Sequence, residues 1–321
     1  MNHSHTHLLA VIMVAATTLS FFAAACERDE RPDENTDTVT DTPVSRTPFD
    51  SNGASVALFS VADGLKVHFS KGNLQYTTVG SHTTPDGQAA GTFRFAERQY
   101  DYIGQNNDMV SDTNSAYIDL LCWGSSGWHV APWSDVDGDY DIESLCGNEA
   151  FADWGVYNAI SNGGNRTGMW RTLTRNEWDY LVNRRAASTV GGCDSARYAQ
   201  ATVCGVAGLI LFPDTFACPT EITINGINSN NMTMNFADNC YTAEQWASLE
   251  DAGAIFLPAA GFRGGTWIST VGEGGSYWAS TCNPNHQAYA LLFINGLVNA
   301  SAECTYDKDR GYGRSVRLVM E

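Results

Sequence analysis

Asn295-Gly296 lies between the apolar pairs Phe293-Ile294 and Leu297-Val298. Both residues of this dipeptide tolerate the positive φ of a type I′ turn, so the pattern is a strong short-range signal of a β-hairpin. A second signal of the same kind, Asp63-Gly64, separates the apolar residues 55–61 and 65–69. β-structure therefore opens and closes the expected folded region, and its core is expected to lack long helices.

Two short helices are expected within this β-rich chain. Residues 174–181 and 242–249 share the pattern T-x-x-[EQ]-W-x-x-L. Each begins with a capping box, in which the Thr hydroxyl and the Glu or Gln side chain bond to N–H groups of the first turn. Glu177 and Glu244 are interpreted as capping or surface residues rather than as acid–base groups. We expect an α+β fold with short twisted antiparallel sheets, two short helices and long loops.

An apolar run near the N-terminus predicts export. Residues 8–25 are apolar and end in small residues, and Cys26 follows, which is typical of a secretory signal with a lipoprotein processing site. Residues 1–25 are the expected signal peptide and Cys26 the lipidated first residue. The alternative is an uncleaved membrane anchor, since the run is just long enough to span a bilayer of about 30 Å. Either way the domain lies outside the cytoplasm.

The acidic residues after Cys26 extend this interpretation. Such a run resembles the surface-export signal of some anaerobic Gram-negative gut bacteria, so we expect an outer-membrane lipoprotein exposed on the cell surface. Residues 26–53, the lipidated cysteine and a stretch rich in Asp, Glu, Thr and Pro, predict a disordered acidic tether. The folded domain is then expected at residues 54–321. A net charge of −18 argues against a nucleic-acid partner, because phosphates would be repelled.

Eight further cysteines remain when Cys26 is set aside from the nine. An even number in an oxidising compartment permits disulfides, although the sequence does not fix their connectivity. Neighbourhood in the sequence suggests Cys193 with Cys204 and Cys218 with Cys240. No C-x-x-C pair occurs, so a zinc site built from these cysteines is not expected.

One loop of alternating carboxylates is a candidate for a metal site. Asp135, Asp137, Asp139 and Asp141 could converge on calcium, which prefers several oxygen ligands. The glycine is at the fourth position of this loop, so the spacing is not that of an EF-hand. A solvated acidic loop is therefore preferred over a calcium site, and no other cofactor is expected.

A series of motifs resembles a known fold. In order, these motifs are WRTLTRNEW at residues 170–178, FLPAAGFR at 256–263, YWAST at 277–281 and GRSVRLV at 313–319. Together they resemble the C-type-lectin-like fold, in the branch shared by formylglycine-generating, sulfatase-modifying enzymes and bacterial major-paralogous-domain surface lipoproteins. The C-terminal part also resembles the variable proteins of diversity-generating retroelements, whose final hairpins carry hypervariable ligand-contacting positions.

The resemblance divides the C-terminal segment into scaffold and contact residues. It implies that Trp278, Val316 and Leu318 are scaffold, and strand alternation turns Ala288, Leu291 and Phe293 toward the core. The implied ligand-contacting positions are Asn283, Asn285, His286, Ala290, Leu292, Ile294, Tyr306, Asp307, Asp309 and Tyr312. Such a mixture of Asn, Asp, Tyr and His on a rigid β scaffold is typical of an adaptable binding surface.

These features favour a surface lipoprotein that binds an extracellular protein or glycan through its C-terminal hairpin face. Gln287, Glu303 and Lys308 depart from the retroelement resemblance, because adenine mutagenesis of Asn codons would not produce them. The alternative is a structural or adhesive envelope lipoprotein without a discrete ligand site. An enzyme is the third hypothesis, because Cys282 and Cys304 are not the closely spaced cysteine pair of formylglycine-generating enzymes.

Overall fold

The computed structural model describes residues 47–83, 87, 89–134, 142, 144–283, 285, 287–303 and 309–321. The chain divides into two units, Met1–Val44 and Ser45–Glu321, and every described residue belongs to the second. The predicted signal peptide and Cys26 therefore lie outside the described residues. Within the described part, no helix is both long enough and apolar enough to cross a membrane.

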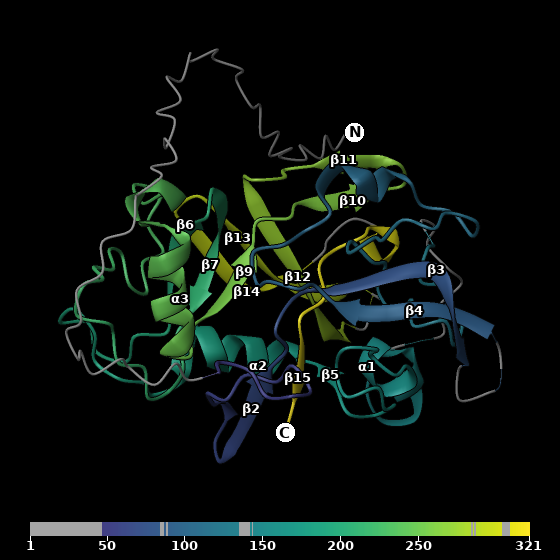
Figure 1. Cartoon of the computed structure of the whole chain (residues 1–321), viewed down its shortest axis with the longest axis horizontal. Helices are drawn as coiled ribbons and strands as arrows, with labels where there is room; N and C mark the ends of the chain where they lie inside the picture. The colour runs from purple at the N-terminus through teal and green to yellow at the C-terminus, as the bar shows by residue number, and fades with distance from the viewer. Residues whose placement is uncertain are drawn as a thin grey trace, which may run out of the picture. The chain divides into compact units, whose positions relative to one another are not determined.

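The first and last strands of the folded unit share one four-stranded sheet (Figure 1). In sheet order its strands are β1 (Phe59–Ala62), β2 (Leu65–Phe69), β15 (Leu318–Met320) and β5 (Arg171–Thr172). Ala62 pairs with Leu65 across the turn at Asp63-Gly64, so the predicted first hairpin is confirmed. Because β15 pairs antiparallel with both β2 and β5, the C-terminus closes the domain against its own beginning.

A second four-stranded sheet has the order β8 (Cys240–Tyr241), β6 (Tyr198–Val203), β7 (Val206–Leu211) and β9 (Ile255–Pro258). The smaller sheets are β3 (Leu74–Thr83) with β4 (Ala89–Phe95), β10 (Phe262–Gly264) with β11 (Trp267–Ser269), and β12 (Gly274–Cys282) with β13 (Ala288–Ile294) and β14 (Leu297–Glu303). Ile294 pairs with Leu297 across Asn295-Gly296, which confirms the predicted second hairpin.

Helices are short and few in the described part of the chain. They are α1 (Trp154–Tyr157), α2 (Arg175–Asp179) and α3 (Ala243–Asp251), the π-turn η3 (Tyr180–Arg184), and the 3₁₀ turns η1 (Gly104–Asp108), η2 (Gly147–Ala152), η4 (Phe236–Asp238) and η5 (Asp309–Gly311). Thr174 and Thr242 cap α2 and α3, and both predicted capping boxes are present. The fold is thus mixed α+β with several short antiparallel sheets.

Tryptophans supply much of the core in place of long helices. The side chains of Trp123, Trp154, Trp170, Trp178 and Trp278 are fully buried. They belong to two of the three apolar clusters, one between the sheets that contain β1 and β13 and the other around β3 and β4. The third cluster lies between the β6–β7 sheet and α3. Large rings bury much apolar area per residue, which suits a domain built from short elements.

The folded unit begins earlier than the sequence predicts. Phe49 forms a β-bridge with Ser55 and packs against the first core cluster. Residues 47–53, which we assigned to the tether, therefore belong to the domain. The single aromatic side chain of this stretch packs against a core cluster whose members come from distant parts of the chain, which the composition of the stretch does not reveal.

The suggested disulfides are absent from the structure, in which Cys193, Cys204, Cys218 and Cys240 are not bonded to one another. The six residues of β6 separate Cys193 from Cys204. At about 3.3 Å per residue this strand is roughly 20 Å long, far beyond the Cα separation that a disulfide bridges. The suggested pairing of Cys193 with Cys204 was therefore wrong, because a strand holds the two residues apart. Cys304 lies outside the described residues.

Candidate functional site

The predicted contact residues of β13 divide between the two faces of the strand. Tyr289, Leu291 and Phe293 point into the first core cluster, while Leu292 and Ile294 are half-buried on the other face. Ala290 also lies on that second face, but it is 1% exposed and sits opposite Trp278 in the second core cluster. Ala290 was therefore wrong as a contact position, because packing around the indole of its cross-strand partner covers it.

The predicted loop residues are only partly described. Asn283 accepts bonds from the backbone N–H groups of Asn285 and Gln287, at 2.9 and 3.0 Å, and its amide donates to Gln287 Oε1. This half-buried side chain shapes the β12–β13 turn, whereas Asn285 is exposed. Asp309 begins η5. His286, Tyr306 and Asp307 lie outside the described residues.

Tyr312 leads to a group of aromatic side chains that the sequence interpretation missed. Its ring centroid lies 6.0 Å from that of Phe262 and 6.0 Å from that of Trp267, and the latter two are 5.3 Å apart. Phe262 and Tyr312 are half-buried, and Trp267 is 50% exposed. We call Phe262, Trp267 and Tyr312 the aromatic face. These centroid distances are those of rings packed against each other, so the face is a platform and not a cage around a cation.

The β10–β11 hairpin holds two of these rings. Phe262, Gly264 and Trp267 share one side of the hairpin, because Gly264 pairs with Trp267 across the strands. A Cβ on Gly264 would fall 2.3–2.7 Å from three atoms of the Trp267 indole. The indole therefore packs directly on Gly264, and the absence of a side chain there is what allows its position.

The opposite side of the hairpin is anchored by Arg263, which is completely buried. Its Nε donates to the carbonyl of Leu120 at 3.1 Å and its Nη2 to that of Ser134 at 2.8 Å. The backbone of Arg263 also exchanges two 2.8 Å hydrogen bonds with Gly313, next to Tyr312. A Cβ on Gly313 would come 2.3 Å from the Leu120 carbonyl oxygen. Glycine at this position thus lets the C-terminal segment join the hairpin and bring Tyr312 to the face.

Arg314 lies at the base of the aromatic face. Its guanidinium carbon is 5.8 Å from the ring centroid of Phe262 and 4.9 Å from that of Trp278. Nη1 donates to Ser276 Oγ at 2.7 Å. Ser276 pairs with Leu292 across β12 and β13, so the predicted contact residue Leu292 and this cation lie on the same side of the sheet.

The candidate calcium ligands Asp135, Asp137, Asp139 and Asp141 lie outside the described residues. The residues that flank them are placed, however. Ser134 accepts the bond from Arg263, and Ile142 accepts one from Arg310 Nη1 at 2.7 Å. Ser134 and Ile142, which flank the acidic segment, are thus each bonded to a buried arginine. In the part of the chain that the structure describes, no three His, Cys, Asp or Glu side chains are grouped as a metal site.

A cavity of about 520 Å³ lies elsewhere on the domain. Its lining includes Arg98, Tyr100, Tyr102 and Cys204. Burial raises the pKa of Tyr100, and its hydrogen bond to Cys204 acts in the same direction. None of the predicted contact residues lines this cavity, so it does not coincide with the C-terminal face.

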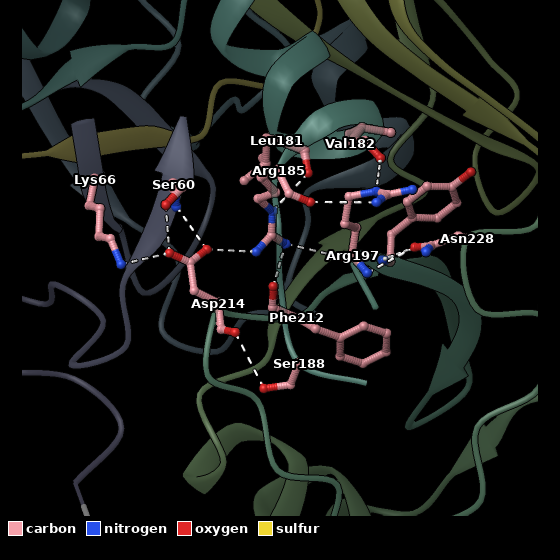
Figure 2. Close-up of polar contacts among 11 residues, drawn as sticks. Ser60, Lys66, Leu181, Val182, Arg185, Ser188, Arg197, Phe212, Asp214 and Asn228 are labelled. Atoms are coloured by element: carbon pink, nitrogen blue, oxygen red, sulfur yellow. Dashed lines mark hydrogen bonds and ion pairs between the residues drawn. The ribbon is translucent and has the colours of Figure 1, made fainter. Parts of the chain in front are cut away.

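A buried ionic network around Arg185 and Asp214 is structural rather than a ligand site (Figure 2). Arg185 is completely buried and lies 3.0 Å from Asp214, which also accepts bonds from the hydroxyl and backbone N–H of Ser60. These bonds join β1 to the segments after β7 and η3. Burial would raise the pKa of Asp214, but the hydrogen bonds from Ser60 and Lys66 and the charge of Arg185 lower it overall.

Sequence reasoning missed Phe262, Trp267 and Arg314, although two of them stand in quoted motifs. The available signal was a tryptophan two residues after Gly264-Gly265, since a Gly-Gly turn followed by an aromatic residue is a hairpin tip that exposes a ring. No family model matches the chain, and comparisons with curated proteins and with solved structures found no match. The geometry of the site therefore carries the functional argument alone.

Proposed function

We propose that this protein is a lipoprotein of the outer membrane that binds an extracellular protein or glycan through the aromatic face and the adjoining C-terminal hairpin. The observation that carries the proposal is the half-exposed indole of Trp267, held on Gly264 and flanked by two further rings. Exposed aromatic side chains on a rigid hairpin are the residues that most often dominate binding energy.

The fold is proposed to be C-type-lectin-like. The short antiparallel sheets, the two capped helices and the sheet that joins the first and last strands support this assignment. Tyr312, which the resemblance implies to be a contact residue, is part of the aromatic face, and this supports a C-terminal ligand site. Whether the segment is diversified by a retroelement is a further part of the proposal, which a neighbouring reverse transcriptase and a near-copy of the coding segment would support.

Membrane attachment is proposed to occur through lipid on Cys26, with display on the cell surface. The acidic residues that follow Cys26 support this localisation. The overall charge of −18 disfavours a nucleic-acid partner. We propose a binding protein rather than an enzyme. The wide spacing of Cys282 and Cys304 supports that choice against formylglycine-generating chemistry.

An array of glycans and extracellular proteins, probed with the full chain in detergent micelles, tests the proposal. We expect binding that Trp267→Ala abolishes. The matched control is Phe151→Ala, which removes a ring of similar exposure, 46%, from a separate aromatic group with Trp128 and Tyr157. Equal loss in both variants, or binding that survives Trp267→Ala, would place the site elsewhere. No binding at all would favour a structural envelope role.

A further inference from the structure

Arg314 carries information about the ligand because its charge has no carboxylate partner among the residues that the structure describes. The side chain is only 9% exposed, and its Nε makes no hydrogen bond. Among the residues that the structure describes, no carboxylate lies within ion-pair distance of it. Arg185 is also interior but pairs with Asp214 at 3.0 Å. Arg263 and Arg317 are buried without a carboxylate too, but each donates to two or more oxygen atoms, whereas Arg314 donates only to Ser276 among the described residues. A buried cation without an anion is unfavourable, so such a group calls for a specific explanation.

The position of Arg314 couples it to the aromatic face. Phe262 lies between Arg314 and Trp267, with its ring centroid 5.8 Å from the guanidinium carbon and 5.3 Å from the Trp267 ring. Tyr312, two residues before Arg314, has its ring centroid 6.0 Å from that of Phe262, so both side chains adjoin the same ring. The cation and the exposed indole are therefore separated by a single aromatic ring, that of Phe262.

We infer that the ligand is a sugar that bears a carboxylate, of the uronic-acid or sialic-acid type, and this inference rests on the proposed function. The C–H face of the sugar ring packs on the indole of Trp267. The carboxylate accepts hydrogen bonds from Arg314, whose planar guanidinium suits carboxylate geometry. The bound anion supplies the counter-charge that the described residues do not.

An acidic peptide fits this surface less well. The chain has a net charge of −18, which repels a ligand with several negative charges. A sugar acid brings a single charge, and that charge meets a cation removed from bulk water. The exposed apolar part of the face is chiefly one ring, Trp267, which matches the size of one sugar residue rather than an extended peptide.

The test uses the full chain in detergent micelles and matched pairs of probes. The probes are the methyl glycosides of glucuronic, galacturonic and N-acetylneuraminic acid, each beside its carboxyl-reduced form. Binding is followed by the NMR signal of the Trp267 indole N–H, assigned by its loss in Trp267→Ala. We expect at least one acid to bind about tenfold more tightly than its reduced form, the preference of one charge-assisted contact. Gly264→Ala, which displaces the indole, weakens binding of both members of that pair.

Substitutions of Arg314 test whether its charge causes the preference for the acid over the carboxyl-reduced sugar. Arg314→Met removes the charge and is expected to abolish the preference for the acid, and Arg314→Lys retains part of it. The thermal midpoint of each variant shows whether it folds. If Arg314→Met does not fold, the preference of Arg314→Lys for the acid is used for the test instead. Equal binding of every acid and its reduced form overturns the sugar-acid inference and leaves the proposed function standing. Binding to a protein but to no sugar, if it depends on Trp267, also overturns the sugar-acid inference and leaves the proposed function standing. No Trp267-dependent binding to any probe or array member overturns both.

Discussion

Asp214→Asn tests whether the network in Figure 2 holds the first hairpin to the domain. Asp214 Oδ1 lies 3.0 Å from Arg185 Nη1, and its oxygens accept bonds from the hydroxyl and backbone N–H of Ser60 at 2.6 and 2.9 Å. Arg185 has an exposed fraction of 0% and Asp214 of 10%. Burial lowers the pKa of Arg185 to about 10, so the side chain remains charged at neutral pH. The variant therefore leaves a buried cation without its carboxylate.

The expected loss of stability depends on the hydrogen-bond partners that the Arg185 guanidinium keeps in the variant. Removing one partner of a buried ion pair destabilises a protein by about 3–5 kcal/mol. The carbonyls of Leu181, Arg197 and Phe212 still accept hydrogen bonds from Arg185, and an amide oxygen can still accept from Ser60. We therefore expect the lower end of this range, about 3 kcal/mol. In a domain of this size that lowers Tm by roughly 6–12 °C.

Guanidinium chloride unfolding, followed by the fluorescence of the buried tryptophans, measures the loss. The control is Lys66→Met, which removes a second cation 3.0 Å from Asp214 whose side chain is 48% exposed. Loss of such an exposed partner is expected to change the free energy of unfolding by less than about 1 kcal/mol. This explanation is wrong if the free energy of unfolding of Asp214→Asn is within about 1 kcal/mol of that of the wild type. It is also wrong if Asp214→Asn and Lys66→Met lose the same amount of stability.

The same pair predicts a pH dependence. Because bonds to Ser60 and Lys66 and the charge of Arg185 hold the pKa of Asp214 below its ordinary value, its contribution to stability is complete above about pH 4, the unfolded pKa. That contribution is lost as the pH falls through the lower folded pKa. The variant lacks this part of the acid sensitivity, so its loss of stability relative to the wild type should shrink at low pH.

Cys26→Ser removes the thiol that lipidation needs. We expect this variant to incorporate no palmitate and to leave the membrane fraction. Unchanged membrane attachment would contradict the lipoprotein proposal. Thr174→Ala removes the hydroxyl of the α2 capping box and should lower the free energy of unfolding, measured in urea, by about 1 kcal/mol. Thr174→Ser keeps the hydroxyl and should lower it by less. Burial raises the pKa of Asp119 and of Asp153 to about 6, above the value of an unfolded Asp. Between about pH 4 and 6 the folded state therefore holds protons that the unfolded chain has released. Stability should fall as the pH rises through this window. A Tm that does not change there would be inconsistent with raised pKa values of these buried carboxyls.

Local signals predicted the elements that local chemistry stabilises. The turns at Asp63-Gly64 and Asn295-Gly296 and the caps at Thr174 and Thr242 all agree with the structure. In each case the residues that form the feature lie within four positions of one another. Their geometry is therefore fixed by backbone preferences and short-range hydrogen bonds, which the sequence states directly.

The final segment shows where such reasoning stops. Polar and apolar residues alternate through much of residues 314–319, which is typical of a half-buried strand, but the regular strand β15 begins only at Leu318. Arg314 and Arg317 are 9% and 1% exposed. Arg317 donates to Asn73 and Gln99, which are 244 and 218 positions away in the chain. A charged residue normally predicts exposure, so only partners brought from the far end of the domain could reveal its burial.

The candidate site divides in the same way. From the sequence came a β-rich terminus with hairpins, a C-terminal segment proposed to bind, and Tyr312 as one contact residue. The burial of Ala290 beside Trp278 and the joining of Tyr312 to Phe262 and Trp267 were decided by the tertiary structure alone. Turns and caps depend on neighbours in the chain, whereas exposure and the pairing of charges depend on which distant elements pack together. That packing is what turned a run of hairpins into a platform with a buried cation beneath it.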